Sequence, residues 1–178
     1  TANRTYGCDA SDGEISLGRA DCFRLRAVYE SLASGTNAAA PTLTTGSITG
    51  TFQRGEIITG GTSGAKGFLI TTTSPLQYVL ITATDFSSTD ALTGATSGAT
   101  ATASAKTDGD TVVTSDFTLD TGQRDNYYDI SRIVRKPGVP APTGKLLVVF
   151  DYFEHGTGDL FTVDSYPTAG VEFSYKDI

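Results

Sequence analysis

The chain has 178 residues and a formal net charge of -7, because 20 acidic residues outnumber 13 basic ones. This balance argues against nucleic acid as a partner, since phosphate binding needs clustered Lys and Arg, and the one basic cluster (Arg132, Arg135 and Lys136) is interpreted as a solvated strand end. No apolar run approaches the ~20 residues of a membrane helix, so no membrane partner is predicted. The chain has no Met and begins at Thr1, which predicts a processed chain or a segment of a longer one.

The N-terminal segment is predicted to be mainly extended. Residues 21–30, DCFRLRAVYE, alternate in part between polar and apolar, so we expect a strand with Phe23, Leu25 and Ala27 on one face; a helix is the alternative. Residues 38–46 are rich in Ala and then contain Pro, Thr and Gly, which is typical of a linker.

The two cysteines are interpreted as small, partly buried thiols. Cys8 and Cys22 could also form a disulfide, which a sequence alone cannot establish. They cannot make a tetrahedral zinc site by themselves, and the only histidine, His155, is distant in the sequence.

A duplicated β-unit is predicted for residues 47–106. GEIITGGTSGAKG at 55–67 is echoed by ALTGATSGATA at 91–101, with a constant offset of 34 positions (94 − 60 and 98 − 64). The segment is rich in Ile, Thr, Tyr, Phe and Val, which favour strands. Two copies are too few for a solenoid and are expected to form a small pseudo-symmetric barrel or sandwich.

The glycine-rich stretch at residues 60–67 is not predicted to bind a phosphate. In a phosphate-binding loop, Ser or Thr follows the lysine and a helix comes next. Here Gly67 follows the lysine, a β-like segment comes next, and the second copy has no cation. We interpret both stretches as tight turns in which Gly60, Gly61 and Gly64 permit positive φ and the Thr and Ser hydroxyls close the turn.

Residues 107–178 are predicted to supply most of the main core. GKLLVVFDYFE at 144–154 is the clearest strand of the chain, and residues 125–133 could hold a short helical turn. We therefore expect an all-β fold with little helix: a discontinuous sandwich or barrel-like domain, 1–46 with 107–178, interrupted by the glycine-repeat insert 47–106.

The remaining carboxylates do not form a convincing catalytic or metal motif. Asp151, Glu154, His155 and Asp159 lie close in sequence, and a polysaccharide depolymerase using some of them is the catalytic alternative. Residues 107–111 and 156–164 offer oxygen ligands but not the density of a calcium loop. The chain is predicted not to be an enzyme and to need no cofactor or metal.

The most unusual polar stretch is DTGQRDNYYD at residues 120–129. Its arginine is flanked by three aspartates, and its tyrosines combine apolar rings with polar tips. The pattern indicates either a buried polar network at a corner of the fold or a docking surface for another subunit. The candidate residues are Asp120, Arg124, Asp125, Tyr127, Tyr128 and Asp129.

The long segment from Phe117 to Tyr166 resembles virion structural proteins of tailed phages, most closely those of contractile-tailed cyanophages. TYGCDASDGEISLGRADCFRLRAVYES at residues 5–31 is similar to what precedes that segment in the same proteins. The glycine repeat is similar to small inserts in phage baseplate and tail-fibre chains, and by itself it is a weak signal. The family offers no catalytic motif to place on this sequence.

The resemblance implies a structural part of a virion (baseplate, tail or fibre) that acts through subunit interfaces. It implies other phage virion proteins as partners and a homo-oligomer, with a trimer as one candidate form. A carbohydrate-binding β-domain is a further alternative to this function.

Overall fold

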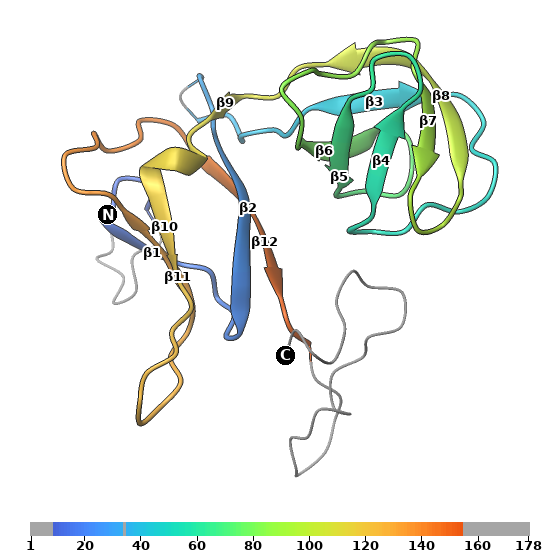
Figure 1. Cartoon of the computed structure of the whole chain (residues 1–178). Coiled ribbons are helices and arrows are strands. Elements are labelled where there is room, and N and C mark those ends of the chain that lie inside the picture. Colours follow the sequence, from blue (N-terminus) through green and yellow to red (C-terminus); the bar gives the residue numbers. More distant parts are fainter. Residues whose placement is uncertain (1–8, 34, 155–178) are drawn as a thin grey trace. The chain divides into compact units, whose positions relative to one another are not determined.

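The computed structural model describes residues 9–33 and 35–154 and is almost entirely β-structure, as predicted. In this range the only helical element is the short 3-10 helix η1 (Thr114–Asp116). The chain divides into two compact units, coloured along the sequence in Figure 1. We call residues 9–39 with 110–154 the outer unit and residues 40–109 the barrel, and each is described by itself.

The outer unit consists of two antiparallel three-stranded sheets, with strand orders β1-β11-β10 and β12-β2-β9. The N-terminal strands therefore pair with the C-terminal region, as expected: β1 pairs with β11, and β2 pairs with β12. The bounds are β1 (Glu14–Ser16), β2 (Cys22–Glu30), β9 (Thr111–Val112), β10 (Phe117–Asp120), β11 (Arg132–Arg135) and β12 (Leu146–Tyr152).

Strand β2 confirms the predicted strand, but its side chains do not alternate as expected. The register with β12 shifts twice, so that Arg26 and Phe23 are extra residues on β2. Such bulges rotate the side chains that follow. Consequently Phe23 is 36% exposed, whereas Ala27 is buried together with its neighbour Val28, which packs in the core of the outer unit.

Residues 125–133 contain no helical turn, so this prediction is wrong. Arg132–Arg135 is instead the central strand of its sheet, paired on one side with β1 and on the other with β10. Ile133 is fully buried, with Phe117 and Val28, in the core of this unit. Pairing of Arg132–Arg135 with strands on both sides outweighs the local helical spacing of the residues before it.

The barrel is a closed ring of six antiparallel strands in the order β3-β6-β5-β4-β7-β8. Its first strand, Thr42–Thr45, lies within the segment predicted to be a linker, so that prediction is wrong. Leu43 in this strand is 0% exposed, and the strand closes the ring between β6 and β8. The bounds are β3 (Thr42–Thr45), β4 (Ile57–Gly60), β5 (Lys66–Leu69), β6 (Leu76–Leu80), β7 (Ala91–Gly94) and β8 (Thr100–Thr107).

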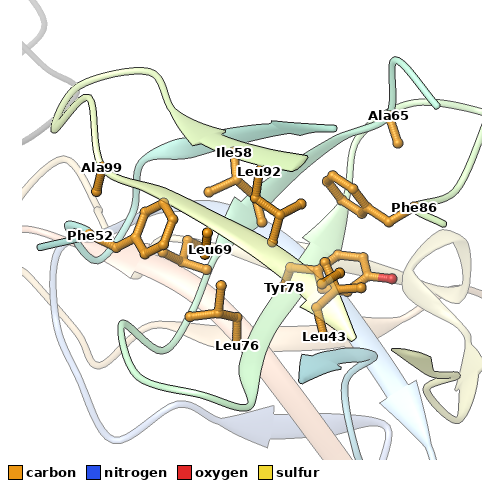
Figure 2. Close-up of a cluster of buried hydrophobic side chains, with 12 residues drawn as sticks. Leu43, Phe52, Ile58, Ala65, Leu69, Leu76, Tyr78, Phe86, Leu92 and Ala99 are labelled. Atoms are coloured by element: carbon orange, nitrogen blue, oxygen red, sulfur yellow. The ribbon is translucent and has the colours of Figure 1, made fainter. Parts of the chain in front are cut away.

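The barrel has the internal symmetry that the repeat predicts. Exchanging β3, β4 and β5 with β6, β7 and β8 leaves the order of the ring unchanged. Both halves contribute equivalent side chains to one core: Ile58 and Leu92 lie close together in it, and Phe52 and Phe86 lie on opposite sides of it (Figure 2). The duplicated sequence is therefore one barrel made of two interleaved halves.

The chain leaves and re-enters the outer unit at neighbouring positions. Ala39 donates its N–H to the carboxylate of Asp110 (2.8 Å), and the N–H of Asp110 donates to the carbonyl of Ala39 (2.9 Å). This short neck brackets the barrel at residues 40–109, a wider span than the predicted insert 47–106.

Candidate functional site

The turn between β4 and β5 has backbone N–H groups that could bind an anion, but a carboxylate of the protein already fills the position. The N–H groups of Thr62 and Ser63 donate to Asp90 at 3.1 and 3.0 Å, and the Ser63 hydroxyl donates to the same carboxylate at 2.6 Å. Asp90 is 0% exposed. The glycine-rich stretch is thus a capped turn, which agrees with the rejection of a phosphate loop.

The second turn is capped in the same way by the first half of the barrel. Thr96 and Ser97 donate their N–H groups to Glu56 at 3.1 and 3.0 Å, and the Ser97 hydroxyl donates to it at 2.9 Å. Glu56 and Asp90 are themselves 34 positions apart (90 − 56), the offset of the repeat. Each half therefore supplies the carboxylate that caps the turn of the other half, an arrangement we call the crossed caps.

The same carboxylates also bind the loop before their own strand. Glu56 accepts from the N–H of Gln53 at 2.6 Å, and Asp90 accepts from the N–H of Ser87 at 2.7 Å. Burial alone would raise the pKa of both carboxyls, but these hydrogen bonds and those from the turns outweigh it. The pKa of each therefore lies below its ordinary value, and both groups are charged at neutral pH.

The glycines of these turns serve two purposes, and the sequence predicted only one. Gly64 and Gly98 have positive φ, at 68° and 66°. Gly60 and Gly61 do not, contrary to the prediction. Gly60 is required because a Cβ there would lie 2.6 Å from the Ser63 hydroxyl and 2.7 Å from the carboxylate of Asp90.

The crossed caps were missed because Glu56 and Asp90 lie far in sequence from the turns they bind. The sequence did contain one signal for them: the acidic residues Glu56 and Asp90 recur at the same offset as the glycines of the repeat. All the capping contacts stay inside the barrel, so we assign these carboxylates to its stability.

The predicted polar stretch forms a hairpin that connects β10 to β11, and we call residues 121–131 the arm. Its tip is a turn in which the N–H of Arg124 donates to the carbonyl of Tyr127 (3.0 Å). Below the tip, the N–H of Asp129 donates to the carbonyl of Gly122 (2.8 Å). Gly122 has a φ of 78°, and a Cβ there would overlap the carbonyl of Asp129.

Ion pairs hold the base of the arm. Asp120 accepts two hydrogen bonds from the guanidinium of Arg124, at 2.7 and 3.0 Å. Arg132 of β11 pairs with Asp129, and with Glu14 of β1 at 2.9 Å. Arg132 also lies 3.5 Å from Asp120, so it joins the pairs into one network.

The network stabilises the charged form of Asp120. The hydrogen bonds from Arg124, followed by the N–H of Gly122, lower the pKa of this carboxyl to about 2. Arg132 was predicted to lie at a solvated strand end, yet it is a partly buried member of the network. The side chains of the network are partly exposed at the surface. The first hypothesis for this stretch, a buried polar network, therefore does not describe it.

A buried serine fixes the arm to the N-terminal part of the outer unit. Ser131, which is fully buried, donates its hydroxyl to the carbonyl of Thr121 (2.8 Å) and accepts from the N–H of Cys22 (3.2 Å). Its backbone N–H donates to the carbonyl of Arg19, and its carbonyl accepts from the N–H of Leu17. Sequence reasoning did not identify Ser131, because three of its four partners, Leu17, Arg19 and Cys22, lie more than a hundred positions away.

The arm carries large, exposed side chains. Tyr127 is 60% exposed, Tyr128 is 76% exposed and Ile130 is 44% exposed. Asp125 is exposed in the turn and takes part in none of the ion pairs between the described residues. Of the six predicted residues, the structure thus brings Asp120, Arg124 and Asp129 into the network through Arg132, while the other three form the tip.

The carboxylates considered for catalysis are engaged where the structure describes them. Asp151 pairs with Arg26 at 2.6 Å, and Glu154 accepts from the hydroxyl of Tyr152 at 2.9 Å. His155 and Asp159 lie outside the described residues.

The residues considered as calcium or zinc ligands have other contacts where the structure describes them. In the segment 107–111, Asp108 pairs with Lys106 and Asp110 holds the neck; the segment 156–164 lies outside the described residues. Within residues 9–33 and 35–154, no group of three or more His, Cys, Asp or Glu side chains is placed to hold a metal ion. Cys22 is a buried, free thiol whose pKa is raised, mainly by burial. Cys8 is not among the described residues.

Comparison of the chain with protein families, curated proteins and solved structures finds no match. No helix in the part of the chain that the structure describes is long and apolar enough to cross a membrane.

Proposed function

We propose that the chain is a structural component of a tailed-phage virion (baseplate, tail or fibre) and that the arm is one of its contacts with other virion proteins. The resemblance of residues 117–166 to virion structural proteins motivates the proposal, and the arm lies within this segment. The observation that carries it is an exposed aromatic tip on a base fixed by ion pairs and by Ser131.

The chemistry of the arm suits an interface between proteins. Tyrosine is enriched at such interfaces because a large ring is buried while its hydroxyl still finds a hydrogen bond. Binding costs less when the contacting groups are already ordered, and the base of the arm is held by the Asp120–Arg124 and Arg132–Asp129 pairs. Tyr127 and Tyr128 are therefore the residues we expect to contribute most to binding.

The proposal places the protein in the virion, with other virion proteins or further copies of the chain as partners; a trimer is one candidate form. Antibodies raised against the chain test this location. They should decorate tails, baseplates or fibres of purified particles in electron micrographs. Detection of the chain only as free protein, unattached to any particle, would contradict the proposal.

The role of the arm is tested by replacing both tyrosines, as Tyr127→Ser with Tyr128→Ser. We expect the variant to fold normally, because both side chains are exposed, but to be incorporated into particles at least tenfold less than the wild type. The matched control is Ile81→Ser, which removes another exposed apolar side chain, 51% exposed, from the barrel. Equal incorporation of all three proteins would show that the arm is not a contact.

The adjacent exposed tyrosines also favour a second candidate, a carbohydrate-binding domain, because sugars stack on aromatic rings. This function predicts binding to a glycan array that is lost in the same double variant. A flat array result for the wild type would remove this candidate and leave the virion proposal unaffected.

A further inference from the structure

The outer unit contains a cavity of about 250 Å³. Three segments line it: the end of β2, the turn η1 with its neighbours, and the proline-rich loop between β11 and β12. The lining residues are Glu30, Val113, Asp116, Phe117 and residues 139–143. An engineered apolar cavity of about 150 Å³ accommodates benzene, so this one has room for an aliphatic chain of about four to six carbons.

The lining is mainly apolar and carries negative charge. Val113, the buried ring of Phe117, Val139, two prolines and an alanine supply the apolar part. The charged groups are the carboxylates of Glu30 and Asp116, and none of the described lining residues is basic. Ligand sites commonly combine an apolar lining with a few polar groups that set specificity. This lining therefore favours a ligand that is apolar along its length and positively charged at one end.

The carboxylate of Glu30 is held in place by the loop. Its Oε1 accepts from the N–H groups of Thr143 and Gly144, at 2.6 and 3.0 Å, and from the Thr143 hydroxyl at 3.3 Å. Gly144 lies so close to β2 that a Cβ there would overlap the carbonyl of Ser31. These contacts order the carboxylate and the loop together, which lowers the ordering cost of binding a ligand.

Each carboxylate has one oxygen that is not engaged. Asp116 accepts at Oδ1 from the hydroxyl of Ser115 (3.2 Å), and Glu30 uses only Oε1. Among the described residues, no group donates to Oδ2 of Asp116 or Oε2 of Glu30, and no Lys or Arg pairs with either. An ammonium has three N–H donors that can reach separate acceptors, whereas a guanidinium fork matches both oxygens of one carboxylate. The arrangement therefore favours an ammonium.

We infer that this cavity binds a primary ammonium group carried on an aliphatic chain of about four to six carbons. The chain contacts the apolar lining, including Phe117 and Val139, and the ammonium donates to the unengaged oxygens of Glu30 and Asp116. A lysine side chain of another polypeptide and a free aliphatic amine share this chemistry. The cavity does not include the arm, so the inference does not rest on the proposed function.

Titration of the full chain with n-pentylamine at neutral pH and constant ionic strength, followed by amide NMR spectra, tests the site. We expect the N–H signals of Val113, Phe117 and Thr143 to shift and to saturate. The neutral analogue n-pentanol should bind at least about tenfold more weakly, because it lacks the charge. Absence of binding by the amine, or equal affinities of the amine and the alcohol, would overturn the inference.

Substitution of the carboxylates tests their role. Asp116→Asn and Glu30→Gln should each weaken binding of pentylammonium at least about threefold, since each removes one charge. Glu30→Gln keeps an amide oxygen for the loop contacts, and Asp116→Asn does not depend on them. The matched control is Asp125→Asn, which removes the same charge from the exposed arm and should leave the affinity unchanged. Equal losses in all three variants would mean only general attraction to an acidic protein.

A series of amines of increasing chain length tests the apolar part of the cavity. Affinity should rise about threefold to fourfold with each methylene from ethylammonium to pentylammonium, because each added group is buried. Equal binding of ammonium chloride and pentylammonium would mean that the carboxylates attract any cation, and the cavity would not be the site.

Two further probes distinguish the sources of the ammonium. Binding of Nα-acetyl-lysine N-methylamide as tightly as pentylammonium would identify a lysine side chain of another polypeptide as the ligand. Binding of pentylammonium alone would identify a free amine. Lys136, which is exposed and precedes the loop, is the competitor within the chain. Binding seen only in Lys136→Gln would mean that Lys136 itself occupies the cavity, and the inference would be wrong.

Discussion

At the scale of single residues, the barrel depends on Glu56 and Asp90. Each is buried, charged and surrounded by hydrogen-bond donors from the opposite half of the repeat. A buried charge is tolerated only when it is paired or well hydrogen-bonded, and removing its charge leaves the donors poorly satisfied. These residues therefore link the two halves more specifically than the apolar core does.

Replacing Asp90 by Asn should destabilise the barrel by about 2–4 kcal/mol, because charge-assisted hydrogen bonds to two N–H groups and a hydroxyl of the turn are weakened or lost. Urea unfolding followed by circular dichroism measures this free energy. The matched control is Asp108→Asn, which removes an exposed ion pair to Lys106 and should cost less than about 1 kcal/mol. Equal effects of the two substitutions would contradict the role of the crossed caps.

The crossed caps also predict how the stability of the barrel depends on pH. The pKa values of Glu56 and Asp90 are lower in the folded state, so the unfolded chain binds more protons in acid. Their contribution is complete above the unfolded pKa values of about 4 and is lost as the pH falls through the lower folded values.

Urea unfolding between pH 6 and pH 2 should show this loss, and the double variant Glu56→Gln with Asp90→Asn should show a shallower decline. Parallel pH profiles for the two proteins would mean that other carboxylates cause the acid sensitivity.

At the scale of elements, the arm depends on one glycine. Gly122 combines a positive φ with a close approach to the carbonyl of Asp129, so neither its backbone conformation nor its space admits a side chain. The two strands of the arm can therefore approach each other this closely only with glycine at position 122.

Gly122→Ala should open the arm and increase hydrogen exchange of residues 121–130 at least tenfold, while exchange in the barrel stays unchanged. Gly138→Ala is the matched control, since Gly138 has a φ of 83° but open space around its Cβ position. We expect this control to lose about 1 kcal/mol of stability without opening the arm. Unchanged exchange in Gly122→Ala would refute the requirement for glycine.

At the scale of the whole molecule, the barrel is a closed unit with its own core. All six strands pair within residues 40–109, and most of its buried apolar side chains form one cluster. The chain enters the barrel after Ala39 and leaves it before Asp110, and two hydrogen bonds join these two residues.

A polypeptide of residues 40–109 should therefore fold by itself. Circular dichroism should give a β-type spectrum and one cooperative thermal transition, and Asp90→Asn should lower the midpoint of that transition. A disordered spectrum, or a midpoint that Asp90→Asn leaves unchanged, would contradict the independence of the unit.

The sequence by itself determined the local features of this protein. It predicted the all-β class, strands within residues 21–30 and 144–154, which the structure places at 22–30 and 146–152, and the duplication at an offset of 34 (94 − 60). These follow from alternation, β-propensity and turn residues, which act over a few neighbouring positions. The aspartates and the arginine of the arm were also visible as a dense polar stretch.

Only the tertiary structure decided the rest. The segment Thr42–Thr45 is a strand because it pairs with β6 on one side and with β8 on the other, which closes the ring. These partners lie far away in the sequence, so the local residue pattern did not predict this strand. Glu56, Asp90 and Ser131 acquired their roles from groups far away in the sequence, brought near by barrel closure and by strand pairing. A carboxylate or hydroxyl in a sequence does not indicate its partners, because hydrogen bonds depend on distance in space.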